Sequence, residues 1–262
     1  MKIAFFVFFM TICVFSGAQA FEISKADTLT IADRVFKNEC SVEKDCLLEW
    51  SVGENFLSLG MEHFIWYPAH APGIFKEGFR TYLQYAKDTG EKLPVWLDKT
   101  PFPPCPWSSR EEFLRSKESA QYKDLEDFII RTKHCQAQYL IENTRNSIED
   151  IIAAAPDDQR ARISKYLSLL TSYPQGLYSI IDYMNFKGAG IGNSDEVKGE
   201  RWGLLQVLEG MNDKPTAREA LEEFVRSAKI VLTHRVYYAP AEKHEEQWLQ
   251  GWLRRVESYL EI

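Results

Sequence analysis

Five glutamates lie within one short stretch of the chain, residues 38–68, among cysteines, glycines and aromatic residues, and four of them are candidates for chemistry. These four are Glu39, Glu49, Glu54 and Glu62. Cleavage of a glycosidic bond requires two carboxyl groups, one to protonate the leaving oxygen and one to activate water or attack the sugar. The residue types in this stretch therefore indicate acid chemistry on a carbohydrate.

Glu39 is the first candidate for the general acid. The amphipathic run that contains Ile31, Val35 and Phe36 predicts a helix that ends near Glu39. The helix dipole disfavours a carboxylate at this end, so an acid kept there suggests a function. An apolar cleft would raise its pKa, as a general acid requires. A plain surface acid at the end of a helix is the alternative.

The second carboxylate has three candidates. Glu54 follows Gly53 on a predicted turn and is the first choice, with Glu49 second and Glu62 third. A solvated strand face would explain each of them equally well. Ser58 is the candidate for positioning the attacking water.

Four further side chains are candidates for holding a glycan. Trp66 and Tyr67 are expected to stack on sugar rings, and Tyr67 beside Pro68 is expected to be exposed. Asn185 and Gln206 are expected to donate hydrogen bonds to N-acetyl groups. Aromatic residues at this spacing also fill cores, and buried amides that brace the strands are an equal alternative.

The first 20 residues predict a secretory signal peptide. Lys2 precedes an apolar run, and the small residues at positions 18 and 20 predict cleavage before Phe21. The remaining chain has 30 basic and 38 acidic residues, a net charge of −8, which argues against nucleic acid as a partner. No other stretch is long and apolar enough to span a membrane. We expect a monomer in the periplasm or outside the cell.

The predicted mature chain contains four cysteines: Cys40, Cys46, Cys105 and Cys135. An oxidising compartment allows three disulfide pairings. The preferred one joins Cys40 to Cys46, which would brace the loop after Glu39, and Cys105 to Cys135. A metal site is disfavoured because the spacings lack a close Cys-x-x-Cys pair. No cofactor is expected, since two carboxyl groups perform the proton transfers themselves.

Residues 21–262 predict a single domain with two lobes, mainly α (α+β) in class. Apolar residues recur at helical spacing over residues 125–129, 139–152 and 163–170, and further helices are expected at about 202–210, 216–236 and 245–260. The glycines and aromatics of residues 47–67 predict turns and short strands. A proline-rich loop over residues 100–107 is expected to be held by Cys105. The outline is a helical bundle with a small β excursion after the first long helix.

This outline resembles the lysozyme-like superfamily, most closely the phage-type lysozymes and endolysins. In that family an acid ends the first helix, a second carboxylate and a Thr or Ser lie in the β excursion, and a Gly-x-Gly-His motif closes it. Glu39 matches the acid, Ser58 the hydroxyl position, and Gly60 and His63 the closing motif. Glu62 departs from the motif, because it replaces the second glycine.

Weaker similarities lie further along the chain. Residues 180–188 resemble the helix behind the cleft of that family, and Gly203-Leu-Leu-Gln206 resembles a motif of lytic transglycosylases. The pattern around residues 38–40 and 63–68 is also similar to a group of uncharacterised secreted bacterial proteins. The resemblance implies a lysozyme-like fold and cleavage of peptidoglycan or a related N-acetylated glycan. A lytic transglycosylase and a non-catalytic glycan-binding or structural envelope protein are the alternatives.

Overall fold

The fold is seen in a computed structural model that describes residues 27, 28, 30, 31, 33, 34, 47–71, 73, 75–192, 196–213 and 216–261. The protein is mainly helical, with 60% helix and a small antiparallel sheet. The described helices and strands are β1 (Leu48–Glu49), β2 (Leu57–Leu59), β3 (Phe64–Trp66), α2 (Phe79–Asp88), α3 (Arg110–Arg115), α4 (Ala120–Arg131), α5 (Lys133–Ala154), α6 (Arg160–Thr171), α7 (Pro174–Lys187), α8 (Leu204–Glu209), α9 (Ala217–Tyr238) and α10 (Glu246–Glu257), with short 3-10 turns at η2 (Ala241–Lys243) and η3 (Ser258–Leu260).

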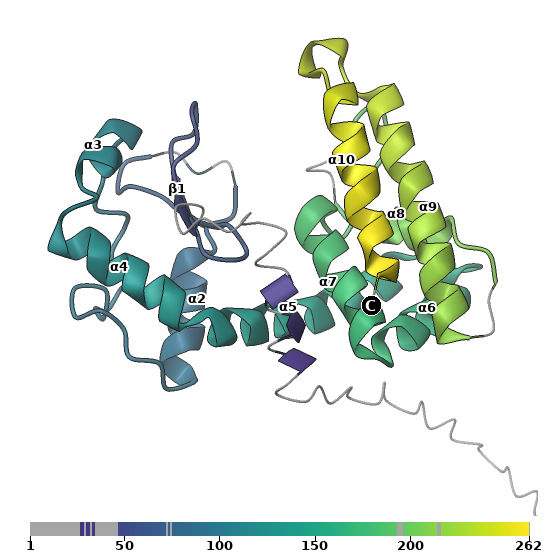
Figure 1. The fold of residues 1–262 in the computed structure, drawn as a ribbon, viewed down its shortest axis with the longest axis horizontal. Coiled ribbons are helices and arrows are strands. Elements are labelled where there is room, and N and C mark those ends of the chain that lie inside the picture. Colours follow the sequence, from purple (N-terminus) through teal and green to yellow (C-terminus); the bar gives the residue numbers. More distant parts are fainter. Residues whose placement is uncertain are drawn as a thin grey trace, which may run out of the picture.

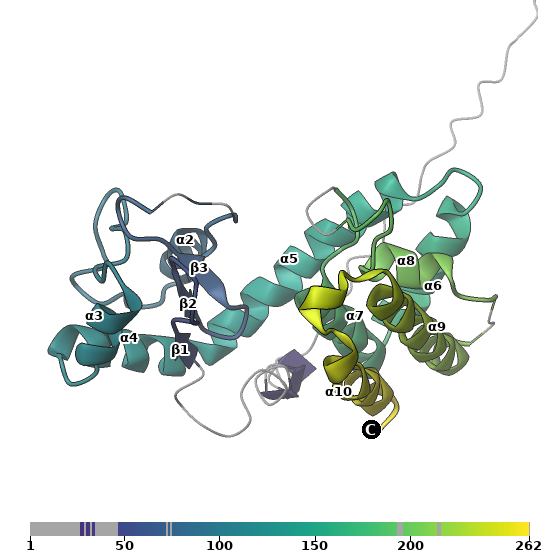
Figure 2. The same cartoon turned by 90° about the horizontal axis from the view of Figure 1, so that it is seen from above.

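Two hydrophobic cores organise these elements into two lobes, which the long helix α5 joins (Figures 1 and 2). The first core gathers side chains from the sheet and from α2, α3 and α4, while the second gathers side chains from α6 to α10. Helix α5 contributes to both: Cys135 lies in the first core, and Leu140 and Ile151 lie in the second. We call these the sheet lobe and the helical lobe.

The three strands form one sheet in the order β1-β2-β3. Leu48 pairs with Leu59, and Leu59 with Phe64, so that all three side chains lie on the buried face. Glu49, Ser58 and Ile65 share the opposite face, because neighbouring residues on a strand point to opposite sides. The predicted short strands of residues 47–67 are thus confirmed.

A short described segment before the sheet lies against the helical lobe. The described residues between 27 and 34 are helical, and Ile31 is buried in the core of the helical lobe. The guanidinium carbon of Arg34 lies 4.5 Å from the centre of the Tyr178 ring on α7. The chain therefore begins its described part in one lobe and builds the sheet in the other.

Local signals in the sequence explain where several helices begin. The Thr216 hydroxyl caps α9, because it accepts a hydrogen bond of 3.3 Å from the Glu219 amide. Pro174 lies in the first turn of α7, where the helix does not need the amide proton that proline lacks. The helices expected in the second half of the chain are confirmed, with small differences in their ends. Helices α2 and α3 had not been predicted.

Candidate functional site

Three of the predicted site residues, Glu39, Cys40 and Cys46, lie outside the described residues. The assignment of Glu39 as the general acid therefore stays a prediction. The other candidates all lie within the described part of the chain. Of the acids in residues 47–68, Glu62 has the environment most suited to proton transfer.

Glu62 lies in the turn between β2 and β3, which helix α5 holds in place. The Met61 amide donates to Gln136 Oε1 on α5 at 3.0 Å, and Gln136 Nε2 donates to the Ile129 carbonyl at 2.7 Å. Gly60 has a positive φ of 68°, and a Cβ at this position would collide with the Gln136 amide. The glycine of the Gly60-x-Glu62-His63 sequence is thus explained by close contact with α5.

The same turn lies where the two cores meet. Met61 is buried in the core of the helical lobe, whereas Leu59 and Phe64 on either side of it are buried in the core of the sheet lobe. Glu62 itself is half-buried, and its Oε1 atom is buried with no hydrogen-bond partner. The carboxyl group is consequently deprived of much of its hydration.

Burial raises the pKa of Glu62 from 4.5 to about 8, and a hydrogen bond with Asn143 on α5 opposes this effect. Tyr139, one turn earlier on α5, is also hydrogen-bonded to Asn143; burial raises its pKa, and the charge of Glu62 adds to the increase. At neutral pH, the Glu62 carboxyl group is therefore protonated. A protonated, half-buried carboxyl group is the form that a general acid requires.

Sequence reasoning ranked Glu62 third among the possible partners of Glu39 and did not identify the residues around it. Gln136, Tyr139 and Asn143 match no catalytic motif. Their spacing of three and four residues was the available signal, because it places them on one face of a helix.

Glu54, the first choice for the second carboxylate, lies away from this turn. Glu54 is exposed in the loop between β1 and β2, beyond the opposite end of β2 from Glu62. It lines a hollow of about 330 Å³ together with Ser109 and Glu111. Hydrogen bonds with its own backbone and with Ser109 lower the pKa of Glu111. This hollow thus holds an ionised carboxylate and lacks the buried acid found at Glu62.

The structure does bring Glu49 and Ser58 together. They face each other on β1 and β2, and Glu49 Oε1 accepts a hydrogen bond from the Ser51 hydroxyl at 3.3 Å. Ser58 is half-buried on the face of the sheet that is turned away from the core. This pair offers a hydroxyl and a carboxylate on neighbouring strands.

The expected sugar-stacking residues are core residues instead. Trp66 is 0% exposed, packs against Phe79 and donates its indole proton to the Pro103 carbonyl at 3.1 Å. Tyr67 is 6% exposed, so the expectation that it is exposed is wrong. Its hydroxyl accepts from the Phe75 amide at 3.1 Å. Burial leaves these two rings no open face for a sugar.

The Gln206 amide is used within the protein. Its Oε1 accepts from the Gly203 amide at 3.0 Å, and its Nε2 donates to the Gly190 carbonyl at 3.2 Å. It braces the start of α8 against the loop after α7 that contains Gly188 and Gly190. It does not brace the strands, as one alternative had it. Asn185 is half-buried on α7.

Asp182, in the segment that resembles the helix behind the cleft, has a structural position as well. It is 0% exposed and accepts two hydrogen bonds from Arg255, each of 2.9 Å, and one of 2.5 Å from the Tyr259 hydroxyl. This network ties the C-terminal helix α10 and the turn η3 to α7. The segment therefore supports the helical lobe, because its acid is wholly used by these contacts.

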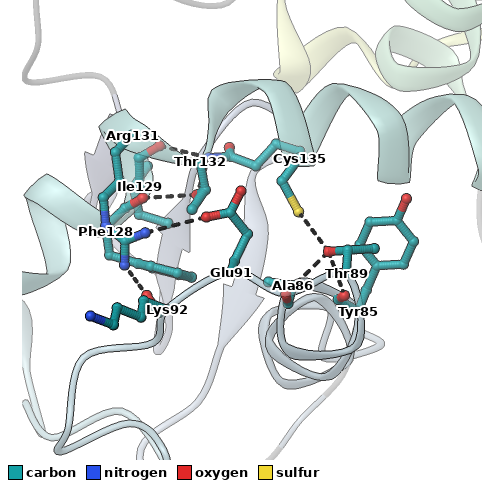
Figure 3. A network of polar contacts seen from close by, with 11 residues as sticks. Tyr85, Ala86, Thr89, Glu91, Lys92, Phe128, Ile129, Arg131, Thr132 and Cys135 are labelled. Atoms are coloured by element: carbon teal, nitrogen blue, oxygen red, sulfur yellow. Dashed lines mark hydrogen bonds and ion pairs between the residues drawn. The ribbon is translucent and has the colours of Figure 1, made fainter.

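The predicted disulfide between Cys105 and Cys135 is absent, and both residues are buried free thiols. Figure 3 shows the Cys135 sulfur directed at the Thr89 hydroxyl on α2, at 3.5 Å. Cys105 holds the proline-rich loop through its backbone instead, because its amide donates to the Tyr67 carbonyl at 2.9 Å. Burial raises the pKa of the Cys105 thiol to about 12 and also raises that of Cys135.

Comparison of the chain with protein-family models, with curated proteins and with solved structures gave no match. Among the described residues, no helix is long and apolar enough to cross a membrane. Within the same ranges, no three His, Cys, Asp or Glu side chains are grouped so that they could hold a metal ion.

Proposed function

We propose that this protein is a glycoside hydrolase that cleaves peptidoglycan or a related N-acetylated glycan, and that Glu62 is its proton donor. The observation that carries the proposal is the half-buried Glu62 carboxyl group, whose pKa is raised to about 8 at the junction of the two lobes. Such a group keeps its proton at neutral pH and can pass it to a departing sugar oxygen.

The class of the fold supports the proposal. A small sheet near the start of a mainly helical chain agrees with the arrangement that the resemblance implies. The Gly60-Met61-Glu62-His63 turn joins β2 to β3, so it lies within the β excursion and does not close it as the family's motif would. Glu62 places a proton donor in this turn, where the family has a glycine.

The reaction requires a proton donor and a second group that activates the attacking water molecule. Glu62 transfers its proton to the glycosidic oxygen while the bond to the sugar carbon breaks, and a water molecule supplies the hydroxyl group that replaces the leaving sugar. Glu49, beside Ser58 on the open face of the sheet, is the first candidate for the base that takes the proton released by this water molecule. Glu39 is the second candidate for this role. A lytic transglycosylase would need only the donor, because a hydroxyl group of the substrate replaces water.

The test is cleavage of peptidoglycan by the purified chain without residues 1–20, with the products identified by mass spectrometry. Glu62→Gln is expected to lower the turnover at least about 100-fold, the usual contribution of general acid catalysis. Glu118→Gln, which changes an exposed acid on the surface, is the matched control. Retained turnover in Glu62→Gln refutes the assignment of the donor, and Glu39→Gln and Glu49→Gln then identify which acid acts.

A non-catalytic glycan-binding protein is the second candidate. It is favoured by the core positions of Trp66 and Tyr67 and by the internal hydrogen bonds of Gln206, which remove three of the expected substrate contacts. Binding of peptidoglycan without cleavage by the unaltered protein would establish this alternative and refute the hydrolase.

A further inference from the structure

A second hollow lies in the helical lobe, beside the turn that joins α9 to α10. Figure 1 shows this turn at the top of the picture. The hollow has a volume of about 160 Å³ and is more enclosed than the hollow beside Glu54. Its lining residues come from three segments, the turn after residue 195, the end of α9 and the start of α10: Glu196, Val197, Trp202, Arg235, Ala239, Pro240, Lys243 and Glu245. We call it the hairpin hollow.

The walls of the hairpin hollow are rigid. Val197 and Glu200 exchange two backbone hydrogen bonds of 3.0 Å each, and the two residues between them both have positive φ, as in a tight hairpin turn. Trp202 is 3% exposed, and its ring centre lies 5.8 Å from that of Tyr238. These contacts fix an apolar surface inside the hollow before any ligand arrives.

Arg235 is held in one orientation on the rim. Its Nε and Nη2 atoms donate to the two oxygens of Glu245, at 2.8 and 3.1 Å, and its guanidinium carbon lies 5.6 Å from the centre of the Trp252 ring. Its Nη1 atom makes no hydrogen bond with any described residue. A fixed guanidinium group with one unused edge is suited to a carboxylate.

The lining of the hairpin hollow contains two acidic and two basic side chains, although the whole chain carries −7. The pKa of Glu245 is lowered, first by hydrogen bonds from Arg235 and then by the positive charges of Arg235, Lys187 and Lys243. Glu196 is paired with Arg201 at 3.1 Å. Glu245 is thus one carboxylate facing three cations, and the exposed Lys243 ammonium group forms no ion pair within the described ranges.

We propose that the hairpin hollow binds a small monocarboxylate, a free amino acid or the C-terminal residue of a peptide. The carboxylate contacts Lys243 and the Nη1 edge of Arg235, and the apolar part lies against Val197, Ala239 and the edge of Trp202 that lines the hollow. The volume decides the size of the ligand, because sites for drug-sized molecules usually exceed about 300 Å³. The site is separate from Glu62, and the proposal does not rest on the proposed catalysis.

The test is a titration of the purified chain followed by NMR, with the indole proton of Trp202 assigned by the variant Trp202→Phe. The three probes are alanine, N-acetylalanine and alaninamide, and each of the last two differs from alanine by one group. Alanine is expected to shift the resonance saturably in the millimolar range, whereas alaninamide, which lacks the carboxylate, is not. Saturable binding of N-acetylalanine as well identifies peptide ends as ligands, and its absence identifies free amino acids.

Two variants test the contacts. Lys243→Gln is expected to weaken binding at least about tenfold, the usual loss for a hydrogen bond to a charged group. Ala239→Leu is expected to abolish binding by filling the hollow without a change in charge. Lys229→Gln, on α9 but outside the lining, is the matched control. The proposal is refuted if neither carboxylate binds, or if alaninamide binds as tightly as alanine.

Discussion

The Glu62→Gln substitution should change how the stability of the protein depends on pH. The pKa of Glu62 is raised from 4.5 to about 8 in the folded chain. Between these two pH values the unfolded chain has released this proton and the folded chain still holds it. The free energy of unfolding therefore falls as the pH rises through this window, and below pH 4.5 the loss is absent.

The size of the loss follows from the same shift. A pKa raised from 4.5 to about 8 corresponds to about 5 kcal/mol between the two ends of the window. The side chain is half-buried, so water relaxes around the ionised form, and we expect a measured loss of roughly 2–4 kcal/mol. Glutamine does not titrate. At acidic pH, however, the variant should be less stable than the original protein by about 1 kcal/mol, because the amide forms a poorer hydrogen bond than the carboxyl group. The variant should therefore be less stable than the original protein at pH 5 and more stable at pH 9.

Urea unfolding followed by tryptophan fluorescence at several pH values measures this crossover. Comparison with the unaltered protein removes the contribution of the five histidines, because they titrate in both proteins. Glu49→Gln, which replaces an exposed acid on the same sheet, is the control for the loss of one carboxyl group. If the stability difference between Glu62→Gln and the original protein is the same at pH 5 and pH 9, the reasoning about Glu62 is wrong.

Three further predictions concern the packing of the protein. Asp182→Asn should lower the free energy of unfolding by about 3–5 kcal/mol, because it leaves Arg255 without its buried partner. Urea unfolding measures this loss. A loss smaller than that of Asp157→Asn, which changes an exposed acid, would contradict the prediction. Gly203→Ala should lower the free energy of unfolding by about 2 kcal/mol or more, because its Cβ would collide with the Gly190 backbone. Gly251→Ala, in open space on α10, should raise the free energy of unfolding by up to about 1 kcal/mol. Equal effects of the two substitutions in thermal melts would refute the close contact. Cys105 should react slowly with iodoacetamide at pH 8 in the folded state and rapidly in urea, since burial raises its pKa to about 12; a peptide that joins Cys105 to Cys135 in non-reducing mass spectrometry would overturn the free thiols.

The helices of the second half were predictable because each signal is local. The spacing of Ile163, Tyr166, Leu167 and Leu170 defines a buried stripe, and that stripe is the face of α6 that enters the core. Pro174 and Thr216 mark the starts of helices through their own backbone and side-chain chemistry. The short strands were also accessible, because turn residues and aromatics alternate over a few positions.

The roles of the candidate site residues were less predictable. Trp66 and Gln206 carry groups that suit a glycan, and nothing in their local sequence shows that Pro103 and Gly190 use those groups first. The proposed pairing of Cys105 with Cys135 failed for the same kind of reason. A disulfide requires closely spaced Cβ atoms, and that spacing depends on how the proline-rich loop and α5 pack.

By itself, the sequence determined a mainly helical chain with a small sheet near its start, and it located the acids from which a proton donor could be drawn. Only the tertiary structure decided that Glu62 differs from Glu49 and Glu54. These three residues have the same side chain and lie within fourteen positions of one another. The pKa of Glu62 depends on how much water its carboxyl group keeps, and helix α5, arriving from more than seventy residues away, removes much of that water.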